Sequence, residues 1–129
     1  MKKTWLVVLL FGSVMAAHAE APQSTLEHYR QQAGGTATAS AGRALYYRDV
    51  VQNGKTMSCA KCHTADPKKT GMTPAYREIG PLAPVANPRR LTDLKKTEKW
   101  FRRNCDDVLA RECTPQEKAD FVAWLVSLR

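Results

Sequence analysis

The sequence predicts an all-α domain, and three observations carry that prediction. Thr114-Pro115-Gln116-Glu117 has the residues of a capping box with proline in the first turn, and apolar residues recur at helical spacing from there to Leu128. No segment alternates apolar and polar residues as a half-buried strand does. Four prolines between residues 73 and 88 exclude long helices and strands there, which predicts an extended loop that wraps the domain.

Three further helices are expected, over residues 26–33, over residues 41–52, and from a cap at Thr92 or Thr97 to about Asn104. Ser40 is the expected N-cap of the second, because a serine hydroxyl there satisfies an unpaired backbone N–H. Asn53-Gly54 should end that helix, since both residues tolerate the left-handed conformation that often follows a helix.

The first 19 residues have the three parts of a secretory signal peptide. Met1-Lys2-Lys3 is basic, residues 5–15 are almost wholly apolar, and Ala17-His18-Ala19 is an A-x-A cleavage site. The apolar run is shorter than the ~20 residues of a membrane span, and an uncleaved anchor is the alternative. We expect residues 1–19 to be removed, residues 20–39 to form a leader with a short helix, and residues 40–129 to form the folded domain.

Export would place the protein where disulfides persist, most simply in a bacterial periplasm. No segment after the leader is apolar enough to cross a membrane, so no membrane partner is expected after cleavage. The 129 residues include 43% hydrophobic and 25% charged residues, which is ordinary for one globular domain and excludes wholesale disorder.

Cys59-Ala60-Lys61-Cys62-His63 has the C-x-x-C-H pattern of covalent c-type haem attachment. Two thiols at this spacing can form thioethers with the two vinyl groups of one haem, and the adjacent histidine can then bind the iron. A thioredoxin-like pair would need a βαβ setting, a zinc site with Cys105 and Cys113 would leave His63 unexplained, and a disulfide across two residues would be strained. The motif therefore predicts one haem c held by Cys59, Cys62 and His63.

In order along the chain, residues 41–46, the C-x-x-C-H motif, Gly80-Pro81-Leu82 and residues 120–125 resemble the class I cytochromes c. The resemblance covers nearly all of residues 40–128. It implies the family's fold, in which N- and C-terminal helices cross beside one covalently bound haem, with a long proline-rich loop. It places Leu45, Phe121 and Trp124 in the helix contact, and the Pro81 carbonyl as the acceptor of the second ring nitrogen of His63.

The sequence departs from that family in its candidates for the sixth iron ligand. Class I cytochromes c use a methionine shortly before the C-terminal helix, but no methionine follows Met72, and Met57 precedes the haem motif. His28, far upstream, has the pattern of a surface residue. Cys105 and Cys113 are left over, and in an oxidising compartment they are expected to form a disulfide, with a thiolate ligand as the alternative.

Residues 99–105 and 111–115 resemble the SHP-type cytochromes c, an oxygen-binding subgroup. That resemblance implies that Asn104 is the sixth ligand of the oxidised iron, beside a disulfide of Cys105 and Cys113. The alternative is that Asn104 caps the end of a helix. A neutral amide is a weak, hard donor, so it should leave the iron on reduction and open a site for oxygen, nitric oxide or carbon monoxide.

The predicted function is therefore one-electron transfer with reversible binding of a diatomic ligand. The alternatives are a conventional carrier with two axial ligands in both oxidation states, or an enzyme such as an oxygen or peroxide reductase or a nitric oxide dioxygenase. No acid–base pair is evident near Asn104, so we expect no catalytic residue.

The formal net charge is +8, and basic residues crowd the segment before Asn104 and flank the haem motif. Such a positive field would steer an acidic redox partner, and the family resemblance implies a diheme cytochrome c. Nucleic acid is not an expected partner of an exported protein.

Overall fold

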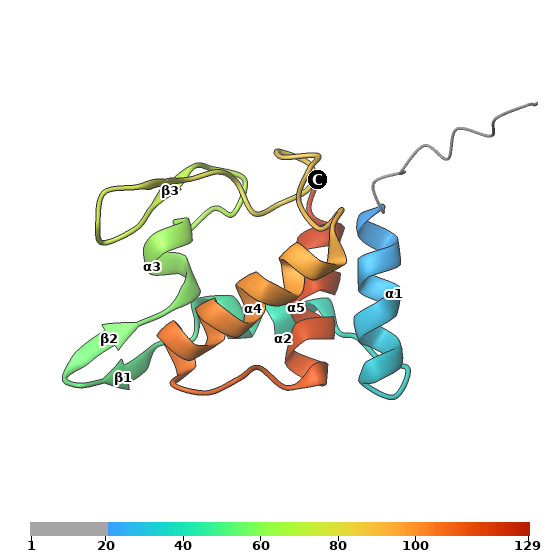
Figure 1. Cartoon of the computed structure of the whole chain (residues 1–129), viewed down its shortest axis with the longest axis horizontal. Helices are drawn as coiled ribbons and strands as arrows, with labels where there is room; N and C mark the ends of the chain where they lie inside the picture. Colours follow the sequence, from blue (N-terminus) through green and yellow to red (C-terminus); the bar gives the residue numbers. More distant parts are fainter. Residues whose placement is uncertain (1–20) are drawn as a thin grey trace, which may run out of the picture.

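The computed structural model describes residues 21–129, so the predicted signal peptide lies outside the described residues. Five helices account for about half of it: α1 (Pro22–Gln32), α2 (Ala39–Tyr47), α3 (Cys59–His63), α4 (Leu94–Leu109) and α5 (Pro115–Ser127). Two small antiparallel ladders accompany them: β1 (Val50–Gln52) with β2 (Lys55–Met57), and β3 (Gly71–Met72) with β4 (Glu78–Ile79). The helices form one body and the ladders lie at its edge (Figure 1), so the all-α prediction is confirmed.

Helices α2 and α5 pack against each other, as the crossed-helix prediction requires. A Cβ atom added to Gly42 would overlap the backbone carbonyl of Asp120, so the two helix backbones touch at this point. Tyr46 is fully buried there, and its ring lies 4.8 Å from that of Trp124 and 6.1 Å from that of Phe121. The expected contact is therefore present, with Tyr46 as its centre.

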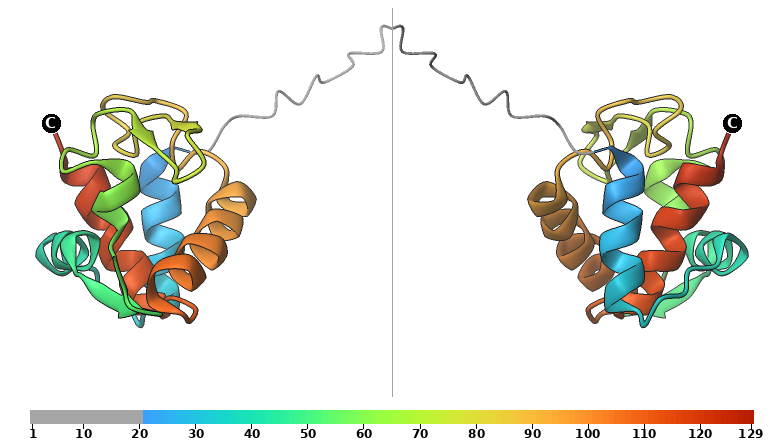
Figure 2. Two further views of the ribbon diagram at one scale, coloured as in Figure 1. Left: turned by 90° about the vertical axis from the view of Figure 1, so that its left-hand side faces the viewer. Right: turned by 90° about the vertical axis from the view of Figure 1, so that its right-hand side faces the viewer.

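Helix α1 covers α5 from the other direction (Figure 2). The side chains of Tyr29, Ala119 and Val122 form a fully buried cluster between the two helices. Thr25 is also fully buried, and its hydroxyl donates to the carbonyl oxygen of Leu91 at 2.8 Å. The segment expected to be a leader is thus part of the core, and its helix begins four residues earlier than predicted.

The predicted helix over residues 41–52 is wrong in its second half. Helix α2 runs from Ala39 to Tyr47 and is followed by the β1–β2 hairpin, with Asn53 and Gly54 both at positive φ in a two-residue turn. Both residues favour such turns as well as helix ends, and the β-branched pair Val50-Val51 favours a strand. The expected N-cap Ser40 is also wrong, because Thr38 precedes the helix and makes no side-chain cap.

The prediction for α4 is wrong at both ends. Asp93, rather than Thr92 or Thr97, caps its start by accepting from the backbone N–H of Lys96 at 2.9 Å. The helix passes through Asn104 and ends at Leu109, and Ala110 adopts the left-handed conformation. Asn104 is therefore an interior helix residue, which contradicts the alternative of a helix cap. The capping box of α5 is confirmed, with reciprocal bonds between Thr114 and Glu117.

Among residues 21–129, no helix combines the length and apolar character that crossing a bilayer requires.

We predict that Gly42→Ala lowers the free energy of unfolding by about 2 kcal/mol, because the added methyl forces α2 away from α5. Guanidinium titration of the haem-loaded protein measures this. The control is Ser40→Ala on the exposed side of α2, which should change stability by less than about 0.5 kcal/mol. Equal unfolding midpoints for Gly42→Ala and wild type would contradict the contact.

Candidate functional site

A cavity of about 820 Å³ lies between α3, α4, α5 and the loop after β4. It is lined by Cys59, Cys62 and His63 of α3, by Trp100, Phe101, Asn104 and Val108 of α4, and by Phe121 and Leu125 of α5. The volume is in the upper range for sites that hold a cofactor-sized ligand. The lining is mostly apolar, and the groups able to bind a metal come from separate elements.

The one-turn helix α3 brings both free thiols and the histidine of the motif to the cavity wall. Gly71 packs so closely on this turn that a Cβ there would overlap the carbonyl oxygen of Cys62. Burial raises the pKa of the Cys59 thiol to about 11 and also raises that of Cys62. A redox-active C-x-x-C pair needs the opposite shift, so the thioredoxin-like alternative finds no support.

Burial, followed by the charge of Arg90, lowers the pKa of His63 to about 4. The ring is therefore neutral at ordinary pH, which is the form that binds a metal. The predicted hydrogen bond to Pro81 is absent from residues 21–129. The Pro81 carbonyl oxygen instead accepts from Arg90 Nε at 2.7 Å and from Asn87 Nδ2 at 3.2 Å.

Asn104 also lines the cavity, from α4. Two other residues considered as ligands lie elsewhere: Met72 is 49% exposed outside the cavity lining, and the His28 ring is hydrogen-bonded to Gln32 on α1. Met57 does line the cavity, two residues before Cys59. In the sequence, the one indication that Met57 could line the site is its position next to the haem motif.

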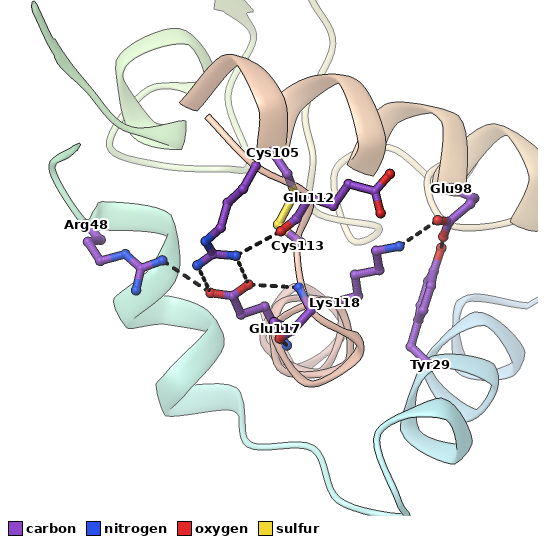
Figure 3. The surroundings of a disulfide bond; sticks show 10 residues. Tyr29, Arg48, Glu98, Cys105, Glu112, Cys113, Glu117 and Lys118 are labelled. Atoms are coloured by element: carbon purple, nitrogen blue, oxygen red, sulfur yellow. Dashed lines mark hydrogen bonds and ion pairs between the residues drawn. A yellow bond between two sulfur atoms is a disulfide. The ribbon is translucent and has the colours of Figure 1, made fainter. Parts of the chain in front are cut away.

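A disulfide joins Cys105, next to Asn104, to Cys113 at the start of α5 (Figure 3). With these sulfurs bonded to each other, the four-cysteine zinc site is excluded, and no group of three potential metal ligands occurs within residues 21–129.

The loop closed by the disulfide is fixed by one carboxylate (Figure 3). Glu117 accepts two hydrogen bonds of 2.8 Å from Arg111 and one of 3.3 Å from Arg48, besides that of its capping box. These contacts, led by the Arg111 hydrogen bonds, lower the pKa of Glu117 to about 2.

The donor set fits a covalently attached haem. Two neutral thiols are three positions apart on one helical turn, the neutral imidazole is adjacent to the second thiol, and all three groups border a largely apolar cavity. Such a cavity accommodates the flat apolar macrocycle, and the thiols are placed to form its thioethers.

Comparison with known proteins also points to a c-type cytochrome. Residues 32–125 match a family described as a domain of unknown function, DUF1924. The chain is 44% identical to the cytochrome c-type protein SHP of Cereibacter sphaeroides, over 92% of this chain and 96% of that one. It belongs to the SHP-type cytochromes c.

The structure of oxidised SHP, an oxygen-binding cytochrome c, superposes with a TM-score of 0.79, covering 84% of this chain and 98% of that one at 44% identity. Cytochrome c'' of Methylophilus methylotrophus is 32% identical over 94% of this chain and 92% of its own. Its oxidised crystal structure gives a TM-score of 0.77, covering 84% and 94% of the two chains. A solution structure of that cytochrome addresses haem-ligand detachment. This SHP-type chain therefore has the cytochrome c fold.

We predict that Glu117→Gln lowers the free energy of unfolding by about 2 kcal/mol at pH 7, because it removes a charged acceptor of several hydrogen bonds. A carboxyl whose folded pKa is depressed stabilises the fold above its ordinary pKa and loses that contribution as pH falls through the folded value. The difference from wild type should therefore shrink between about pH 4.5 and pH 2.

Guanidinium titrations at a series of pH values measure this difference. The matched control is Glu112→Gln, since the exposed Glu112 carboxylate makes no hydrogen bond or ion pair among the described residues. A pH-independent loss in Glu117→Gln would refute the ionic origin.

Proposed function

We propose that the mature protein is an exported, periplasmic monohaem cytochrome that accepts single electrons and binds a diatomic gas when reduced. When attached, the haem supplies a one-electron centre whose ferrous state binds such a gas. The observation that carries the proposal is Asn104 in the cavity lining, on α4, in the region where class I cytochromes c place a methionine and this chain has none. His63 is the one histidine among the described residues that line the cavity. The 44% identical SHP, described as oxygen-binding, supports it.

On the α3 side of the site, the proposed haem attachment is permanent. Cys59 and Cys62 form the two thioethers, and His63 binds the iron in its neutral form. Arg90 and Asn87 hold the neighbouring loop through the Gly80 and Pro81 carbonyls, at 2.7–3.2 Å.

On the other side of the site, the proposed ligand Asn104 binds weakly. The Asn104 carbonyl oxygen is a neutral, hard donor, which would bind ferric iron weakly and ferrous iron more weakly still, so reduction would favour its release. Released, the same side chain presents an NH₂ group that can donate a hydrogen bond to the incoming gas molecule. The detachment of a haem ligand in cytochrome c'' is a precedent within the group of relatives.

Met57 supports a second candidate function, the conventional carrier. Its thioether also lines the cavity, and a thioether binds iron in both oxidation states. We favour Asn104 because Met57 lies two residues before α3, the element that carries His63, whereas Asn104 comes from the separate helix α4 and could bind independently of His63.

An electron donor completes the function. The net positive charge of the chain favours an acidic redox partner such as a diheme cytochrome c. The basic n-region, apolar run and A-x-A site of residues 1–19 support export, and the Cys105–Cys113 disulfide is compatible with an oxidising compartment.

The direct test is the absorption spectrum of the dithionite-reduced protein with and without carbon monoxide. The proposal expects a high-spin reduced spectrum that changes on adding the gas. A low-spin reduced spectrum that the gas leaves unaltered would establish the conventional carrier instead.

We predict that Asn104→Met abolishes carbon monoxide binding and raises the reduction potential, because a thioether retains ferrous iron where an amide does not. Asn104→Ala should change the ferric spectrum and leave the reduced spectrum as in wild type. Spectra in both oxidation states and a potentiometric titration measure these effects.

Met57→Leu is the control for the second candidate ligand, and both of its spectra should match wild type. If Met57→Leu alters the ferric spectrum and Asn104→Ala does not, the ligand is Met57 and the open-site proposal fails.

A further inference from the structure

The outward side of α4 carries five exposed basic residues, here called the α4 cationic face: Lys95, Lys96, Lys99, Arg102 and Arg103. Lys95, Lys99 and Arg102 recur at spacings of four and three residues, so they form one stripe along the helix. Helix α4 lies at the edge of the molecule in both views of Figure 2, which leaves this stripe open to solvent.

The acidic residue nearest the middle of the stripe is engaged elsewhere. Glu98 lies within one helical turn of Lys95 and Arg102, but its carboxylate accepts from Tyr29 Oη at 2.8 Å and from Lys118 Nζ at 2.6 Å (Figure 3). The contact with α1 and α5 thus removes Glu98 from the outward side.

At the two ends of the helix, Asp93 is used as the N-cap, and Asp106 and Asp107 lie near the C-terminus. No ion pair involving the α4 cationic face occurs among the residues that the structure describes. The five cations therefore outnumber the two exposed aspartates near the C-terminus of α4 and attract an external anionic surface.

An exposed aromatic residue lies beside these cations. Trp100 is 42% exposed, lines the cavity described above, and has the Arg103 guanidinium 5.6 Å from its ring centre. Tryptophan and arginine are the residues most often responsible for binding energy in protein interfaces. Trp100 and Lys96, which also lines the cavity, connect the α4 cationic face to the rim of the proposed haem site.

We propose that the α4 cationic face docks the carboxylate-rich surface of an acidic redox protein. The inference rests on the proposed function in one respect, namely that the protein exchanges electrons with a partner. A partner seated here lies over the helix that carries Asn104 and next to the cavity rim, so electrons enter on the side where the weak ligand must leave. Unpaired exposed cations act mainly by raising the association rate, and that rate depends on salt.

The test compares two triple variants that remove the same three charges. Lys95→Gln/Lys99→Gln/Arg102→Gln neutralises the stripe. Lys55→Gln/Lys69→Gln/Arg77→Gln neutralises exposed residues on β2 and around the β3–β4 ladder, whose side chains make no hydrogen bond or ion pair among residues 21–129. Each is loaded with haem, and its rate of reduction by an acidic flavodoxin is followed in a stopped-flow instrument.

At low ionic strength the stripe variant should react about tenfold more slowly than wild type, as three lost attractions of about 0.5 kcal/mol each imply, and the control less than about twofold more slowly. In about 1 M salt, where the Debye length is about 3 Å, the three proteins should react alike. A neutral small reductant should reduce all three at the same rate, and reduction potentials are measured so that driving forces are matched.

Equal slowing in both triple variants would mean that net charge alone attracts the partner, and would overturn the proposal. So would stripe-dependent binding to phosphatidylglycerol vesicles without any effect of the stripe on the flavodoxin reaction, because the face would then bind a membrane. The measurement needs no gas and no movement of Asn104. A reduced protein that fails to bind carbon monoxide would therefore refute the proposed function and leave this result intact.

Discussion

The attachment of α4 to the rest of the molecule is the constraint on which the site depends. Near the middle of the helix, Glu98 is bound by Tyr29 of α1 and Lys118 of α5. Near its end, Cys105 is covalently bonded to Cys113 at the start of α5. Its entry is held by the bond from buried Thr25 to the Leu91 carbonyl. The helix backbone is thus fixed before, at and after the turns that face the cavity.

This attachment limits how a ligand on α4 can detach. Asn104 lies between Glu98 and Cys105 on a continuous helix, and moving its backbone would disturb the Glu98–Lys118 ion pair, the position of the disulfide and the buried packing together. Rotation of the side chain about its own bonds breaks none of them. The sequence predicts Asn104 at the end of a helix, beside a loop, but it lies inside a continuous helix. The proposed release of Asn104 would therefore need only a side-chain rotation on a fixed backbone, with little reorganisation.

What the sequence predicted well was local. The C-x-x-C-H motif and the Thr114 capping box depend on residues within five positions of one another, so their geometry follows from spacing alone. The errors came where one local signal serves two structures. Asn53-Gly54 suits a helix end and a type I′ hairpin equally, and only the pairing of Val50 with Met57 decides between them.

The end of α4 was missed for a different reason. Residues 102–107 are almost all polar, which obscured the apolar spacing of Phe101, Cys105 and Val108 that continues the helix. Burial of Cys105 and Val108 against the body of the protein outweighs that polarity. Likewise Thr25 gave no sign of belonging to the core, because its partner Leu91 lies 66 residues away.

The helical repeat of α4 places residues with three different roles on different sides of the helix. Asn104 and Trp100, four residues apart, face the cavity, while Lys95, Lys99 and Arg102 face solvent. Glu98 contacts α1 and α5, and Cys105, which also borders the cavity, is bonded to Cys113 before α5. Side chains on one face can therefore change without displacing those on another. Because Glu98 binds Tyr29 and Lys118, it does not neutralise Lys95 or Arg102. The contact that anchors α4 therefore also leaves positive charge on its outer side, where it would attract an electron donor.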